Sequence, residues 1–98
     1  MNFTSKQRAS LRSIAHTTEP ACIIGKGGVT EAVKESVDKY LDKNELIKIS
    51  VLKTCELKAK EIAPDLAVSL KATVVECIGG KIVLYRYSDK ENVKHIGF

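Results

Sequence analysis

Residues 23–30 read Ile23-Ile24-Gly25-Lys26-Gly27-Gly28-Val29-Thr30, a β-branched pair followed by a glycine-rich turn. A helical pattern begins directly afterwards, so the stretch marks a junction between a strand and a helix. Glycine carries no Cβ and reaches backbone angles closed to other residues, which suits a tight turn that approaches a partner closely. The next helix would direct its free amide groups and its positive dipole end at the same place, beside the Lys26 ammonium. Such a turn is suited to hold a phosphate oxygen.

Apolar periodicity on both sides of this junction predicts three helices and four strands. The helices are expected over residues 4–16, 30–43 and 54–72, and the strands over residues 21–24, 45–53, 73–78 and 81–87. The order is therefore α-β-α-β-α-β-β, in which helical crossovers join parallel strands. Gly79-Gly80 predicts a hairpin that adds one antiparallel strand. With no internal repeat or linker, residues 1–98 are expected to form a single domain.

Local sequence features refine the ends of these elements. Thr4 or Ser5 is expected to cap the first helix. Asn44 is expected to stop the second helix in a left-handed conformation. Pro64 falls inside the third helical pattern and predicts either a kink or a restart with this proline in a first turn. The tail from Ser88 has no clear pattern.

The charge of the chain is unevenly distributed. The net charge is +4 and the pI is about 9.0, yet residues 1–30 carry four basic side chains against Glu19 alone. These basic residues are Lys6, Arg8, Arg12 and Lys26. Positive charge concentrated around the first helix and the glycine turn is typical of a protein with a polyanionic partner, and a general solubilising charge is the alternative.

Composition narrows the class of protein. A hydrophobic content of 44% and a charged content of 29% are ordinary for a globular protein. No apolar run approaches the roughly 20 residues of a membrane span, and residues 1–6 do not resemble a signal peptide. Cys22, Cys55 and Cys77 lie far apart without metal-site spacing, which favours reduced core thiols. We therefore expect a cytoplasmic protein with no membrane partner.

The glycine turn does not fit the two common nucleotide-binding motifs. A dinucleotide-binding G-x-G-x-x-G motif requires glycine at position 30, where the chain has Thr30. A Walker A loop requires lysine after its last glycine, whereas Lys26 precedes Gly27-Gly28. The remaining match is a G-x-x-G loop between a strand and a helix, the type with which KH modules clamp nucleic-acid backbone. A tight turn with no ligand is the alternative.

The sequence offers little for catalysis or base reading. His16 and His95 lie in no nucleophile or metal pattern, so neither a catalytic site nor a cofactor is expected. The aromatic run of an RNA-recognition-motif sheet is missing. Tyr85 and Tyr87 alternate on the last strand and are expected to pack in the core or at an edge, with base stacking by Tyr87 as the alternative. Binding would therefore depend on phosphates and shape.

Two motifs together carry a family resemblance: Ile24-Gly25-Lys26-Gly27-Gly28-Val29-Thr30 and Gly79-Gly80-Lys81-Ile82-Val83-Leu84-Tyr85-Arg86. Over nearly its whole length the chain resembles a stand-alone CRM domain, the chloroplast RNA splicing and ribosome maturation domain, whose bacterial members are the YhbY proteins. The resemblance implies a two-layer α/β fold similar to the C-terminal domain of translation initiation factor three, a four-stranded mixed sheet with helices packed on it. Pro64 departs from the family pattern.

The resemblance also implies a function. Members of the family bind RNA, and bacterial members associate with precursors of the large ribosomal subunit. The family's G-x-x-G loop falls on four residues here: Gly25, Lys26, Gly27 and Gly28. The expected partner is therefore RNA, in particular ribosomal RNA of large-subunit precursors.

The expected contacts follow from these motifs. The amides of Gly27 and Gly28 and the Lys26 ammonium would hold phosphates. Basic residues elsewhere would extend the contact, namely Arg8, Arg12 and Lys6 on the first helix and Arg86 after the last strand. Two alternatives stay open: a small nucleotide-phosphate-binding protein or enzyme that uses the same turn, and a module that docks onto a ribosomal protein or a second copy of itself.

Overall fold

The computed structural model of the protein describes residues 3–90, 93, 95 and 96. The elements follow in the predicted order: α1 (Ser5–His16), β1 (Cys22–Ile24), α2 (Glu31–Asn44), β2 (Leu46–Val51), α3 (Ala59–Leu70), β3 (Thr73–Ile78) and β4 (Lys81–Tyr85). The α/β class and the mixed sheet of four strands are confirmed.

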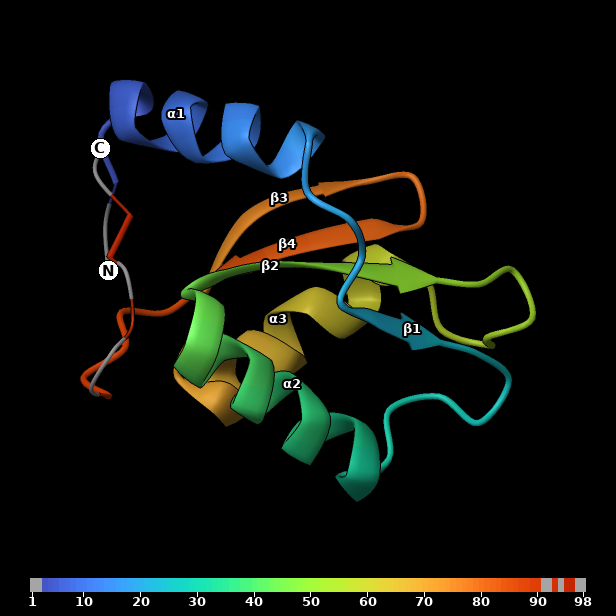
Figure 1. Ribbon diagram of the computed structural model, residues 1–98. Coiled ribbons are helices and arrows are strands. Elements are labelled where there is room, and N and C mark those ends of the chain that lie inside the picture. Colours follow the sequence, from blue (N-terminus) through green and yellow to red (C-terminus); the bar gives the residue numbers. More distant parts are fainter. Residues whose placement is uncertain (1–2, 91–92, 94, 97–98) are drawn as a thin grey trace.

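The strands lie in the order β1-β2-β4-β3, so the last strand of the chain occupies the interior of the sheet (Figure 1). β1 and β2 are parallel, whereas β4 is antiparallel to both of its neighbours. The side chains from Ile82 to Tyr85 are all buried. A strand covered on both faces requires such a continuous apolar run, which explains why the hairpin strand enters the sheet centre.

α2 and α3 lie on the same face of the sheet and enclose the larger core (Figure 1). Its most buried side chains come from both helices and from three strands: Ile24, Val37, Leu41, Ile49, Leu66, Ile82 and Leu84. Burial of each such side chain contributes about 1.5–3 kcal/mol, so this face contributes the larger share of the hydrophobic stabilisation.

Of the described elements, α1 covers the opposite face of the sheet (Figure 1). Leu11 and Ala15 are buried there against Val75, Val83 and Tyr85. The resemblance implied two layers, whereas the sheet lies between α1 and the α2–α3 pair. The physical reason is that the central strands are apolar on both faces, so each face needs a helix to exclude water.

Side-chain caps fix where the first two helices begin. Thr4 and Gln7 form a capping box in which Gln7 N donates to Thr4 Oγ1 at 3.1 Å and Thr4 N donates to Gln7 Oε1 at 3.0 Å. Thr4 is therefore the cap of α1. Thr30 caps α2 by accepting a hydrogen bond from Val33 N at 3.2 Å.

The end of α2 differs from the prediction. Asn44 remains helical, and its Nδ2 donates to Tyr40 O at 3.1 Å. Glu45 instead has the positive φ, at 56°. This conformation is strained for a residue with a Cβ, and contacts made by the Glu45 carboxylate compensate for it, as described below.

α3 is shorter than predicted because residues 54–58 stay outside it. Pro64 is an exposed residue in the second turn of the helix, so the predicted restart at a first turn is not observed. Pro64 leaves the Lys60 carbonyl without its usual amide donor, a loss that an exposed helix face tolerates because water can replace the donor. Residues 52–58 consequently form a long loop beside the sheet.

Candidate nucleic-acid interface

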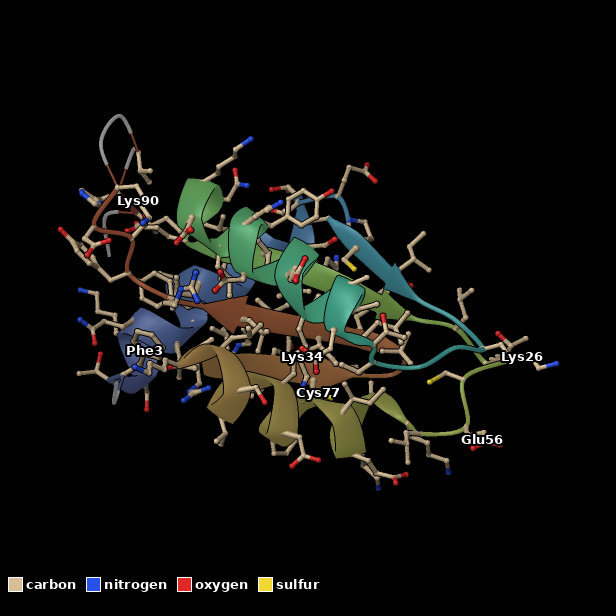
Figure 2. All side chains as sticks on the ribbon, turned by 90° about the horizontal axis from the view of Figure 1, so that it is seen from below. Phe3, Lys26, Lys34, Glu56, Cys77 and Lys90 are labelled. Atoms are coloured by element: carbon tan, nitrogen blue, oxygen red, sulfur yellow. The ribbon has the colours of Figure 1, made fainter. Side chains whose placement is uncertain are left out.

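Three connections between elements meet at one end of the sheet: residues 25–28, residues 52–58, and the Gly79–Gly80 turn with the strand residues that flank it. We call residues 25–28, 52–58 and 78–81 the loop end. Backbone hydrogen bonds join them: Leu52 N donates to Ile24 O at 2.8 Å, and Val51 N donates to Gly80 O at 2.6 Å. Figure 2 shows Lys26 and Glu56 at this end of the molecule, and Phe3 and Lys90 at the other. The glycine turn is thus one part of a larger surface built from three segments.

The glycine turn is closed by a hydrogen bond from Gly28 N to Gly25 O at 2.9 Å. Gly28 has a φ of 68°, which explains the need for glycine there. Lys26 and Gly27 are exposed, and the Lys26 side chain projects away from the body of the protein (Figure 2). Because the Gly28 amide is engaged within the turn, the predicted amide contact to a phosphate is restricted to Gly27.

The start of α2 adds less to this site than the sequence suggested. Val29 and Thr30 separate the glycine turn from the helix, and Thr30 Oγ1 already accepts one of the first amides. The exposed Glu31 carboxylate in the first turn lies 3.8 Å from Lys34 Nζ. Because the Glu31 carboxylate already offsets the positive end of the helix dipole, the lysine side chains are the main source of positive charge at the loop end.

Several lysines of the loop end were not among the predicted site residues. Lys53, Lys58 and Lys81 are exposed there together with Lys26, and Glu56 is the acidic residue in the same three segments. The sequence contained one indication that Lys81 lies at this end of the sheet, since it directly follows the Gly79-Gly80 turn. Placing Lys81 at the same end of the sheet as Lys26 requires the strand order, which periodicity does not provide.

A basic cluster continues onto the part of the sheet that lies beyond the end of α1. Lys48 Nζ donates to Ala15 O at 3.2 Å, and Lys81 Nζ donates to Ser50 Oγ at 2.8 Å. With His16, these two lysines line a cavity of about 170 Å³ next to Glu76. Lys48 and Ser50 alternate along β2 with Ile47, Ile49 and Val51 of the larger core, so they lie on the side of the strand away from that core.

The predicted basic residues of α1 divide into two groups. Lys6 is exposed and Arg12 is half-buried. Arg8 is engaged within the fold, because its Nη1 donates to Val74 O at 3.0 Å and to Val75 O at 2.8 Å, and its guanidinium lies 5.8 Å from the centre of the Phe3 ring. Lys6 and Arg8 belong to the half of α1 that is remote from the glycine turn.

Arg86 also lies outside the loop end, because β4 runs away from it. Nη1 donates to Asp38 Oδ1 at 2.7 Å and to Leu70 O at 2.9 Å, while Nη2 donates to Asp38 O and Asp42 Oδ1, both at 3.0 Å. The Arg86 side chain is 18% exposed. These bonds connect β4 with α2 and the end of α3, so the structure gives Arg86 a role in the fold.

A buried carboxylate organises the end of the chain. Glu45 is fully buried, and its carboxylate accepts hydrogen bonds from Ser88 N at 2.7 Å and Ile96 N at 3.0 Å. His95 Nδ1 lies 2.8 Å from the same carboxylate, and the His95 ring stacks on Tyr87 with centroids 4.6 Å apart. Burial alone would raise the pKa of Glu45, but these hydrogen bonds and the nearby His95 hold it below its usual value.

The described part of the tail is therefore held against α2, although the sequence showed no pattern from Ser88 onward. Residues 91–92, 94 and 97–98 of that tail lie outside the described residues, as do residues 1–2 of the predicted single domain.

The three cysteines are free, and burial raises the pKa of Cys22 and Cys77, although the backbone amide of Ile23 and the charge of Lys60, respectively, oppose the shift. Within residues 3–90, 93, 95 and 96, no three histidine, cysteine or acidic side chains come together in a way that could hold a metal ion. In the same described part of the chain, every helix is too short or too polar to cross a membrane.

Comparisons with known proteins give the family. The pattern of the CRS1 / YhbY (CRM) domain matches residues 3–86. The "Probable RNA-binding protein YqeI" of Bacillus subtilis is 42% identical over 90 residues, which is 92% of this chain and 93% of that protein. The "RNA-binding protein" of Haemophilus influenzae is 31% identical over 92 residues, or 94% of this chain and 93% of that protein.

A solved structure supports the same assignment. The solution structure of a Staphylococcus aureus protein, 38% identical in sequence, superposes with a TM-score of 0.76 and covers 93% of this chain and 95% of its own. The resemblance seen in the glycine turn and in the Gly79–Arg86 motif is therefore confirmed, and the chain belongs to the CRS1/YhbY (CRM) domain family.

Proposed function

We propose that this protein binds RNA without catalysing a reaction and that it holds the RNA backbone at the loop end. The observation that carries the proposal is the gathering of four exposed lysines, against one glutamate, at one end of the sheet, where backbone hydrogen bonds join the segments that carry them. Lys26, Lys53 and Lys58 lie on loops, and Lys81 begins β4, where its Nζ also donates to Ser50 Oγ. A further support is that the related proteins carry the names "Probable RNA-binding protein YqeI" in Bacillus subtilis and "RNA-binding protein" in Haemophilus influenzae.

The binding mode follows from the chemistry of this surface. Lys26 stands on a turn almost free of side chains, so a phosphate group can approach both its ammonium and the Gly27 amide. Lys53, Lys58 and Lys81 would contact neighbouring phosphates. Such contacts fix the position of the strand and carry no base information by themselves.

Of the other predicted contact residues, two are kept as proposed RNA contacts and two are assigned to the stability of the fold. Arg12 and Lys6 remain proposed contacts along α1, secondary to the loop end. Arg8 and Arg86 are bound to backbone carbonyls and, for Arg86, to two carboxylates of α2, so we assign both to the stability of the fold.

The test uses a charge reversal at the glycine turn. The Lys26→Glu and Gly27→Glu double variant should weaken binding to single-stranded RNA in a filter assay at least about tenfold, because each charge contact near a protein surface is worth on the order of 1 kcal/mol or more. Nothing lies within 4 Å of a Cβ placed at Gly27, so the variant should fold.

The matched control is the Ser36→Glu and Lys39→Glu double variant, which introduces the same change of charge at exposed positions of α2. If both double variants bind RNA with the same affinity, the loop end is not the binding surface. Saturable binding of ATP by the unmodified chain in calorimetry, without binding to RNA, would instead support the mononucleotide alternative.

The cellular partner is proposed from the family resemblance. We propose that the protein acts in the cytoplasm on ribosomal RNA of large-subunit precursors. Crosslinking in cells followed by sequencing of the attached RNA should then enrich unprocessed large-subunit ribosomal RNA. Recovery of messenger fragments without that enrichment would contradict the proposed partner and leave the binding surface unaffected.

A further inference from the structure

A groove of about 390 Å³ opens at the loop end, between residues 51–59 and the Gly79–Gly80 turn. Val51, Cys55 and Ala59 form its floor and belong to the larger core. A floor that is part of a close-packed core keeps its shape, so the groove exists before any ligand binds.

The walls of the groove combine exposed aliphatic side chains with bare backbone. Leu52 and Leu57 line the groove and are 45% and 51% exposed. A ligand in the groove would cover this apolar surface. The facing wall is the Gly79–Gly80 turn, and a Cβ at Gly80 would lie 2.7 Å from Val51 O. This wall therefore presents no side chain, which leaves room for a flat group between the leucines and the turn.

The groove directly adjoins the glycine turn. A Cβ placed at Gly25 would lie 3.6 Å from Leu52 Cδ1, and Leu52 N is hydrogen-bonded to Ile24 O. A molecule that places an anionic group at Lys26 can therefore place an attached apolar group against Leu52.

The charges around the groove restrict what this molecule can be. Lys53 and Lys58 line the groove, Lys26 and Lys81 lie in the adjoining segments, and Glu56 is the carboxylate among them. An apolar peptide would bring no negative charge, and a second copy of this chain would bring a net charge of +4. A nucleotide in an RNA strand supplies a flat ring and a phosphate together, and apolar side chains can sandwich a base that has left its stack.

We propose that the groove holds one unstacked base of the RNA strand whose phosphate lies at the glycine turn. This inference rests on the proposed function and deepens it, because it adds a base subsite to a backbone contact. Leu52 and Leu57 cover the base, and the glycine wall admits either a purine or a pyrimidine. The subsite therefore favours single-stranded over double-stranded RNA, since a paired base cannot enter.

The test compares two probes of equal length, a short oligouridylate and the corresponding abasic ribose-phosphate oligomer. Leu57→Ala and, separately, Leu52→Ala should weaken binding of the oligouridylate about fivefold, because each variant removes part of the apolar surface that the base covers. Neither variant should change the affinity for the abasic oligomer. Val68→Ala is the matched control, since Val68 is 81% exposed on α3 and outside the groove.

The outcomes separate this inference from the proposed function. If Lys26→Gln weakens both oligomers while the two leucine variants leave oligouridylate binding unchanged, the base subsite is refuted and the backbone contact stands. An equal loss on both oligomers in the leucine variants would also refute the subsite. If Lys26→Gln changes neither affinity, the proposed function itself is refuted.

Discussion

At the scale of single residues, the guanidinium of Arg86 has a structural function that its sequence context conceals. It is shared between the Asp38 and Asp42 carboxylates of α2 and the Leu70 carbonyl at the end of α3. Because α2 and α3 cover the same face of the sheet, this contact holds the two helices and β4 together. The aspartates come 44 and 48 residues earlier in the chain, so only the folded structure brings the three side chains together.

Arg86→Gln should therefore destabilise the fold. A half-buried arginine with four charge-assisted hydrogen bonds is expected to contribute about 1.5–3 kcal/mol to the free energy of unfolding. Urea denaturation would measure this loss, with Lys39→Gln on the exposed side of α2 as the control. The folded variant should keep its affinity for RNA, and a large loss of affinity at unchanged stability would contradict the structural assignment.

The buried carboxylate of Glu45 leads to a dependence of stability on pH. Its pKa is lower in the folded protein than the ordinary value of about 4.3, so the folded state favours the charged form. The stabilisation is complete above the ordinary pKa and is lost as the pH falls through the lower pKa of the folded state. The difference in unfolding free energy between wild type and Glu45→Gln should therefore be largest near neutral pH and shrink below about pH 4.

Urea denaturation at a series of pH values would measure this difference, and Glu35→Gln at an exposed position of α2 provides the control. A difference between wild type and Glu45→Gln that stays constant down to about pH 3 would show that the carboxylate is not stabilised by Ser88, His95 and Ile96.

At the scale of elements, the glycine turn makes different demands on its last two glycines. Gly28 has a φ of 68°, in a region closed to most residues, whereas Gly27 has open space around its Cβ position and needs no such angle. Gly28→Ala should reduce the free energy of unfolding by about 1–2 kcal/mol, and Gly27→Ala should change it by much less. Thermal unfolding of the two variants side by side would measure the contrast, and equal losses would refute this geometry of the turn.

The element order and several element ends could be predicted because local rules govern them. The Thr4 cap, the strand before Gly25 and the Gly79-Gly80 hairpin follow from short-range preferences and are found in the structure. The start of α3 could not be predicted in this way. The apolar spacing of residues 54–58 continues the helical pattern, but these residues lie in the loop before α3. The Asn44 stop failed because the contacts of Glu45 with a distant tail decide which residue takes the positive φ.

The helix on the second face of the sheet was also beyond local rules. The apolar run from Ile82 to Tyr85 does indicate a strand buried on both faces. That indication becomes decisive only when the position of β4 between β2 and β3 is known.

At the scale of the whole molecule, the two ends of the sheet serve different purposes. The end with Phe3, Arg86 and the tail consists of mutual contacts that hold the fold together. The loop end carries exposed lysines, a side-chain-poor turn and a preformed groove. This division separates the residues that stabilise the protein from those proposed to bind RNA.

The candidate site could be predicted only in part from the sequence. The glycine turn and Lys26 were identified because their chemistry lies within one short segment. Lys53, Lys58 and Lys81 were missed because they join the turn through strand order and loop contacts. Arg8 and Arg86 were grouped with the turn because net charge along the chain does not distinguish an exposed cation from one engaged within the fold.

The salt dependence of RNA affinity is the measurement that tests the central claim most directly. For about four to six phosphate contacts on a single strand, a plot of log affinity against log salt concentration should have a slope of about −3 to −4. Lys26→Gln should make that slope shallower by about 0.7, the share of one phosphate contact, and Lys39→Gln on α2 should leave it unchanged. A slope near zero for the wild type, or the same slope for wild type and Lys26→Gln, would contradict a backbone contact at the glycine turn.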